Sequence, residues 1–125
     1  MKKVLLTILA LILLGCSQEN DDQITIFEGE VQLTGDNQSL EGLEIGISEI
    51  TDCGLFSCDS NWKFYPLNED GFFSIRITTT EAVVLNISVF TADKEQIVVD
   101  CLPGCFDFEP DNKHSNLILY AERRE

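Results

Sequence analysis

Apolar and polar residues alternate along most of the chain after residue 23, and this pattern predicts β-strands. The cleanest alternation is Val83, Leu85, Ile87 and Val89. A period of two places such residues on one face of a strand, and β-branched and aromatic side chains favour strands as well. No stretch of ten or more residues shows the i, i+3, i+4 spacing of a helix. The other alternating stretches are Phe27, Gly29, Val31, Leu33; Leu43, Ile45, Ile47; Trp62, Phe64; Phe73, Ile75, Ile77; Ile97, Val99; and Leu117, Leu119.

Turn-forming residues separate several of these stretches, at 34–37, 68–71 and 92–95. Seven short strands in about 100 residues favour two packed sheets over a single open sheet. We therefore predict an all-β fold, a seven-stranded antiparallel β-sandwich.

The loops can be assigned to the two ends of such a sandwich if successive strands alternate in direction. The loops after the second, fourth and sixth strands then return to the end where the first strand begins. Two of these loops, 51–61 and 102–116, contain three of the four cysteines outside the N-terminal segment, and Cys101 directly precedes the second loop. We expect both to cap that end, and we expect 34–42, 68–71 and 92–95 at the opposite end.

The first residues have the features of a processing signal. Lys2 and Lys3 precede an apolar run, Val4 to Leu14, of 11 residues. A transmembrane helix needs about 20 apolar residues, so the run has the length of a signal peptide instead. The run ends Leu13-Leu14-Gly15-Cys16, which resembles the lipobox of bacterial lipoproteins.

The lipobox resemblance implies that a diacylglyceryl group is attached to the Cys16 thiol and that cleavage occurs just before this residue. The alternative is an ordinary secretory signal with an accidental cysteine. We accordingly expect a signal peptide over 1–15, a lipidated N-terminus and polar tether over 16–23, the β-sandwich over 24–122 and a short tail over 123–125.

Residues next to the lipidated cysteine suggest a location. Ser17 rather than Asp follows Cys16, which resembles outer-membrane retention. Glu19, Asp21 and Asp22 resemble the acidic export signals of surface-exposed lipoproteins, although solvated linkers are also acidic. We expect an outer-membrane protein anchored by its lipid and exposed at the surface, with the periplasmic face as the alternative.

The chain has five cysteines, an odd number that lipidation of Cys16 would explain. The remaining four, Cys53, Cys58, Cys101 and Cys105, would form two disulfides in an oxidising compartment. Three connectivities are open, and we favour the local pairs because each pair falls within one loop. A zinc site and a redox pair are the competing interpretations, but the spacings are Cys-x4-Cys and Cys-x3-Cys rather than the Cys-x-x-Cys of thioredoxin-like proteins.

Three short motifs resemble the transthyretin-like (prealbumin-like) sandwich that carboxypeptidase regulatory-like domains share. They are Phe27-Glu28-Gly29-Glu30-Val31, Leu40-Glu41-Gly42-Leu43-Glu44-Ile45 and Asn68-Glu69-Asp70-Gly71-Phe72-Phe73. The resemblance covers residues 24–122 and implies a two-sheet, immunoglobulin-like fold. No functional residues carry over from it, because the motifs are structural.

Charge and composition exclude some functions. The 22 acidic residues against 8 basic ones give a formal net charge of −14, which argues against a nucleic-acid partner and against binding anionic lipid through a basic patch. The only histidine, His114, is expected in an exposed loop. Motifs for a nucleophile elbow, a phosphate loop or a zinc protease are lacking, so we predict no catalytic residues and no cofactor.

Two further groups of residues are candidate sites. Acids alternate in Asp107–Asn112 as in calcium loops, but this segment lacks the glycine of an EF-hand and has Ile118 where the bidentate glutamate belongs. We therefore predict no metal site, with an irregular calcium site as the alternative. Trp62 shares its phase with Phe64 and is expected in the core, whereas Tyr65 and Phe72 are candidates for an exposed aromatic patch.

These observations favour a lipid-anchored, non-enzymatic envelope protein that acts as a binding or assembly module. Its partners would be the membrane, through the lipid, and an envelope protein or glycan that meets the acidic loops or an exposed strand edge. The alternatives are a calcium-dependent adhesion or glycan-binding domain and a cysteine-based redox protein.

Overall fold

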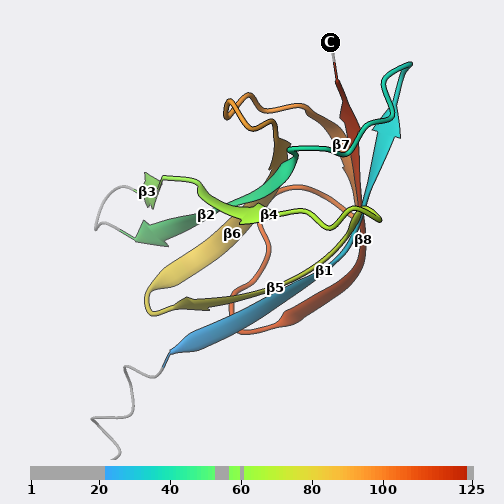
Figure 1. Cartoon of the computed structure of the whole chain (residues 1–125). Coiled ribbons are helices and arrows are strands. Elements are labelled where there is room, and N and C mark those ends of the chain that lie inside the picture. Colours follow the sequence, from blue (N-terminus) through green and yellow to red (C-terminus); the bar gives the residue numbers. More distant parts are fainter. Residues whose placement is uncertain (1–21, 53–56, 60, 124–125) are drawn as a thin grey trace, which may run out of the picture.

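The computed structural model describes residues 22–52, 57–59 and 61–123, and within them all regular structure is β-strand (Figure 1). This part of the chain has no helix of the length and hydropathy needed to cross a bilayer. The strands are β1 (Gln23–Thr34), β2 (Glu44–Asp52), β3 (Ser57–Asp59), β4 (Lys63–Pro66), β5 (Phe72–Thr79), β6 (Ala82–Phe90), β7 (Val98–Leu102) and β8 (Lys113–Glu122). The predicted signal peptide, Cys16 and Cys53 lie outside the described residues.

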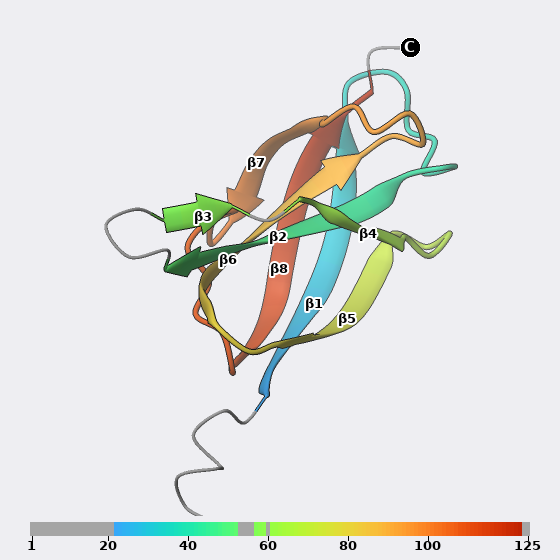
Figure 2. The ribbon, with the colours of Figure 1, turned by 90° about the vertical axis from the view of Figure 1, so that its left-hand side faces the viewer.

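The strands form two facing sheets, as expected for a β-sandwich. Sheet A has the order β5-β1-β8-β7. In sheet B, β6 pairs along one edge of β2, while β3 and β4 pair with successive parts of the other edge. Figure 2 shows β2 crossing obliquely in front of β1 and β8. The described residues thus contain eight strands rather than seven, because the short β3 forms within the segment predicted as a loop.

The sandwich is not wholly antiparallel, because β1 and β8 pair in parallel. The other strand pairs are antiparallel. The reason lies in the alternation of direction itself. β3 and β4 are both antiparallel to β2, so the chain does not reverse direction between them. With this one exception the direction reverses from each strand to the next, and β1 and β8 therefore point the same way. When these two strands become neighbours, their pairing has to be parallel.

The core lies between the sheets and is built from the alternating residues that the sequence indicates. Its buried side chains include Phe27, Val31, Leu43, Ile45, Ile47, Phe73, Ile75, Ile77, Leu85, Ile87, Val89, Leu117 and Leu119. Val83 and Val99 were expected among them but are 53% and 58% exposed. Each is an extra residue at a β-bulge, since the register passes from Val84 to Ala82 on β6 and from Val98 to Asp100 on β7. The bulge turns the extra side chain out of the core.

Four of the described loops, 35–43, 67–71, 80–81 and 91–97, lie at the ends that strand alternation predicts, whereas most of the predicted cap 102–116 runs along one flank. Gln23 pairs with Thr79, and β6 begins three residues later, so the β5–β6 turn lies at the pole where β1 begins. We call this the N-terminal pole. Glu44 pairs with Phe90, which places the loops 35–43, 67–71 and 91–97 together at the opposite pole.

One flank of the sandwich is closed by the segment 103–112, which runs along the outer edge of β6. The Ile87 N–H donates to the Cys105 carbonyl at 2.9 Å, and Leu85 and Phe108 exchange two backbone hydrogen bonds of 2.8 and 2.9 Å. The ring of Phe108 enters the core against Phe27. This segment satisfies backbone groups that an edge strand would otherwise expose.

Candidate functional site

The outer face of sheet A has a groove where β1 and β8 fall out of register. Phe27 pairs with His114 and Gly29 with Leu117, so a single residue on β1, Glu28, faces two on β8. This bulge includes Asn116, whose φ of 60° lies in the left-handed region that asparagine tolerates better than most residues. A Cβ added at Gly29 would lie 2.2 Å from the Leu117 carbonyl oxygen. Glycine at this position therefore permits the close approach of the two strands.

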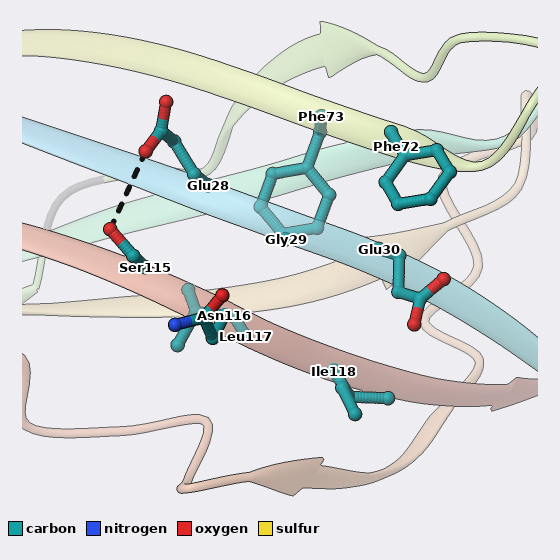
Figure 3. Close-up of a pocket in the computed structure, with 9 residues that line it drawn as sticks. All are labelled: Glu28, Gly29, Glu30, Phe72, Phe73, Ser115, Asn116, Leu117 and Ile118. Atoms are coloured by element: carbon teal, nitrogen blue, oxygen red, sulfur yellow. Dashed lines mark hydrogen bonds between the residues drawn. The ribbon is translucent and has the colours of Figure 1, made fainter.

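The groove encloses about 370 Å³ and is open to solvent (Figure 3). In the close-up, Phe72 from β5 lies on one side, Asn116 and Ile118 from β8 lie on the other, and the two carboxylates of β1 lie between them. The full lining is Glu28, Gly29, Glu30, Phe72, Phe73, Ser115, Asn116, Leu117 and Ile118. Three neighbouring strands of the same sheet thus contribute to one site.

Glu28 is held in place by its neighbours. Its carboxylate lies 3.1 Å from the Lys113 ammonium and accepts hydrogen bonds of 3.4 Å from the hydroxyls of Ser74 and Ser115. The hydrogen bond from Lys113 is the largest cause that lowers the pKa of Glu28 below its ordinary value of 4.5, and partial desolvation opposes it. This carboxylate is therefore ionised and internally compensated.

Glu30 has a different environment. Its Oε1 accepts a hydrogen bond of 2.9 Å from the Gln32 side-chain amide. Within residues 22–52, 57–59 and 61–123, neither of the two ion pairs involves Glu30. Glu30 also lies between apolar neighbours, because it pairs with Phe72 on β5 and with Ile118 on β8. The groove therefore contains one carboxylate, that of Glu30, which forms no ion pair with any basic residue of the described ranges.

Apolar side chains continue across the sheet from this point. Phe72 is 54% exposed, and Leu102 on β7, which pairs with Ile118, is 48% exposed. The register thus places Phe72, Glu30, Ile118 and Leu102 in one row across the four strands of sheet A. Single exposed apolar residues are ordinary on protein surfaces, whereas an aligned row beside a groove is a feature of interaction surfaces.

The predicted cysteine sites are described in part. Cys101 and Cys105 form a disulfide with a Cα–Cα distance of 5.2 Å, as the local pairing predicts. Cys58 is disulfide-bonded as well, to a partner outside the described residues. The expectation that Cys101–Cys105 caps the N-terminal pole is wrong. Cys101 pairs with Leu119 and the Cys105 carbonyl accepts from Ile87, so this disulfide lies on the flank, joining the end of β7 to the edge of β6.

His114 was predicted to lie in an exposed loop. It lies instead near the start of β8. Its ring stacks on Phe27 with a centroid distance of 5.3 Å and meets the edge of Phe108 at 4.9 Å. Its Nε2 donates to the Glu109 carbonyl oxygen at 2.8 Å. The imidazole is thus a packing residue that anchors the loop before β8, and it is not among the residues that line the groove.

The alternating acids of Asp107–Asn112 do not converge on a common point. Asp111 Oδ1 accepts a hydrogen bond of 3.3 Å from the Ile24 N–H, and the Asp111 N–H donates to Thr25 Oγ1 at 2.9 Å. No group of three or more His, Cys, Asp or Glu side chains in the described ranges could hold a metal ion. This loop is tied to β1 by hydrogen bonds of its backbone and side chains.

The expected phase of β4 is reversed. Tyr65, predicted to be exposed, pairs with the buried Ile45 and packs against the core, where burial raises the pKa of its phenol above the ordinary value of 10.0. Trp62 and Phe64, predicted to be in the core, instead contact Phe90 on the outer face of sheet B, with centroid distances of 5.1 and 5.0 Å. A strand of four residues is too short for alternation alone to fix which face is buried.

Of the groove residues, only Phe72 was predicted from the sequence as part of an exposed site. Its neighbour Phe73 belongs to the alternating residues of the core, so Phe72 was expected on the opposite, outer face. Glu28, Glu30, Ser115 and Asn116 were missed. No sequence signal marks the bulge that brings Ser115 and Asn116 beside Glu28, since it depends on how β8 pairs with a strand almost 90 residues away.

Comparisons of the chain with protein-family models, curated proteins and solved structures found no match.

Proposed function

We propose that this protein is a lipid-anchored, non-enzymatic module of the bacterial outer membrane that binds a partner through the groove on sheet A. The anchor is supported by Leu13-Leu14-Gly15-Cys16, which resembles a lipobox, and by the polar residues that follow it. Lipid chains stabilise membrane association by about 0.8 kcal/mol per buried methylene, and two or more chains are needed for stable anchoring. Exposure at the cell surface follows from the acids of the tether.

The position of the groove suits a tethered binding module. β1 begins at Gln23, the last residue of the proposed tether, and Glu28 and Glu30 follow on the same strand. At about 3.3 Å per residue, Glu28 lies roughly 17 Å from the start of β1. The groove would therefore face sideways from the domain, clear of the anchor point, where another envelope component can reach it.

We also propose that the fold is transthyretin-like. The glycines of the three motifs support this assignment because each meets a demanding backbone condition. Gly29 allows β1 and β8 to approach closely, while Gly42 and Gly71 have φ values of 76° and 84° in the turns that lead into β2 and β5. Residues with a Cβ are strained in that region of φ.

The observation that carries the functional proposal is that Glu30, which no basic residue in the described part of the chain pairs, lies beside the exposed Phe72. A charged group and a large apolar ring adjacent on an uncovered sheet face are typical of a recognition surface. The groove supplies two carboxylates, a hydroxyl and an amide, but no histidine and no cysteine. Its chemistry therefore favours binding over nucleophilic catalysis.

Two measurements in the native host test the proposal. Intact-mass analysis should show lipid on Cys16, and Cys16→Ser should release the protein from the membrane fraction. A photo-crosslinking residue at position 72 should give one discrete crosslinked product. The same residue at Val83, which is equally exposed but at the N-terminal pole, serves as the control and should not give that product. A bare Cys16 thiol, or identical crosslinking from both positions, would refute the proposal.

A further inference from the structure

We propose that the groove receives an arginine side chain, presented between apolar residues by a segment of a partner protein. This inference rests on the proposed function, because it names the chemistry of the partner that the groove binds. It follows from the charge of Glu30, the exposed ring of Phe72 and the apolar row that crosses sheet A.

Charge selects a cationic group. Glu30 is the carboxylate in the groove that no described basic residue pairs, whereas Glu28 is compensated by Lys113. The chain as a whole has a formal net charge of −14, which attracts cations toward an acidic groove and repels anions. Glu30 is partly buried, and an ion pair at a partly buried site is stronger than one in open water.

Shape and stacking favour guanidinium over ammonium. Phe72 lies directly opposite Glu30 across the β1–β5 pair, so a cation that binds Glu30 also meets the ring of Phe72. A planar guanidinium can stack on the ring while it donates two hydrogen bonds to the carboxylate. Asn116, on the opposite side of the groove, can accept a further hydrogen bond through its side-chain oxygen.

Apolar residues on both sides of Glu30 define what should flank the arginine. Phe72 lies on one side, and Ile118 and Leu102 continue the row on the other. A ligand segment with leucine-like side chains next to its arginine would cover these exposed groups, and they would stabilise the complex by the hydrophobic effect.

The same charges disfavour a second copy of this chain as the occupant. On the outer face of sheet A the acids outnumber the bases: Glu28, Glu30, Asp100 and Glu122 lie there with Lys113 and Arg76. Two such faces would bring an excess of like charges together, which destabilises an interface. A basic partner has the complementary charge.

The test is a set of ¹⁵N NMR titrations of the folded domain with short peptides. The probe is acetyl-Leu-Arg-Leu-amide, and its matched control replaces arginine with citrulline, which keeps the shape but loses the charge. We expect shifts centred on Glu30, Phe72 and Ile118, and binding of the citrulline peptide weaker by about fivefold or more. A peptide with lysine in place of arginine should also bind more weakly than the arginine peptide. A Gly-Arg-Gly peptide should bind more weakly as well, because it lacks the apolar side chains that flank the arginine.

Protein variants locate the site. Glu30→Gln and Phe72→Ala should each weaken binding of the arginine peptide by about threefold or more. Glu81→Gln removes the same charge from the exposed β5–β6 turn at the N-terminal pole, away from the groove, and should change binding by less than about twofold. Both groove side chains are on the surface, and the amide spectrum of each variant confirms that it is folded. Equal binding of the arginine and citrulline peptides, or equal losses in Glu30→Gln and Glu81→Gln, would overturn the inference.

Failure of this inference is distinguishable from failure of the proposed function. If crosslinking from position 72 still gives its discrete product but the arginine peptide binds no better than the citrulline peptide, the groove binds another chemistry. If the crosslinked product is also absent, the groove is not the binding site and both proposals fall.

Discussion

Phe72 and Glu30 lie directly opposite one another on β5 and β1, with both side chains on the outer face of sheet A. Side chains in such cross-strand positions are about 4.5–5.5 Å apart at their Cβ atoms. The Phe72 ring lies on the β5 side and the Glu30 carboxylate is turned toward β8 (Figure 3), so the pair forms one unit that presents an aromatic and an acidic group to the same groove. The following predictions test the packing that holds this unit in place.

Phe72 and Phe73 are adjacent on β5 and face opposite sides of sheet A, so they form a matched pair. Phe73 is 4% exposed within the core, and Phe73→Ala should lower the free energy of unfolding by about 3–5 kcal/mol. Phe72→Ala should cost less than about 1 kcal/mol because its ring is largely in solvent. Urea denaturation of both variants measures the difference, and similar losses for the two would show that Phe72 is not a surface residue.

Gly29→Ala should destabilise the protein strongly. The new Cβ would lie 2.2 Å from the Leu117 carbonyl oxygen, and a backbone atom cannot move away without disrupting the β1–β8 pair. We expect a loss of about 2 kcal/mol or more in the free energy of unfolding. Gly104→Ala is the control, because no atom lies within 4 Å of its Cβ position, and thermal unfolding should show it near wild type.

The pKa of Glu28 should depend on Lys113. The ion pair holds this pKa below 4.5, so its contribution to stability is complete above about pH 4.5 and is lost as the pH falls through the lower value of the folded state. Lys113→Met should raise the pKa of Glu28, as ¹³C NMR titration of the carboxyl group can measure. Lys63→Met on sheet B provides the control. An unchanged titration of Glu28 in Lys113→Met would contradict the described ion pair.

Loss of the Cys101–Cys105 disulfide should open the flank of the sandwich. A loop this short contributes about 2 kcal/mol through chain entropy, so Cys101→Ala with Cys105→Ala should lower stability by roughly that amount, with an added cost for the cavity at Cys101. Hydrogen exchange should accelerate at the Ile87 amide, which donates to the Cys105 carbonyl. The Val31 amide, which donates to Gly71 at the other edge of the fold, should be less affected.

The sequence determined the all-β class and most of the core, because alternation is a local property that the strand geometry imposes. Ile45, Ile75, Leu85 and Leu119 are buried where the period of two places them. The alternation of strand directions likewise followed from the order of strands and turns, and it placed the loops 35–43, 67–71 and 91–97 together at one pole. It did not place the segment 103–112, which runs along the flank of the sandwich instead of capping the N-terminal pole.

Tertiary structure alone decided the groove and the positions where the local pattern failed. At Val83, Val99 and the Ser115–Asn116 pair, one strand has an extra residue relative to its partner. Such a bulge shifts the inward phase by one position, and its place depends on a partner strand distant in the sequence. The pairing of β1 with β8 also brought Glu28 beside Lys113 and set Glu30 between Phe72 and Ile118, because contacts across a sheet are fixed by register and not by sequence neighbourhood.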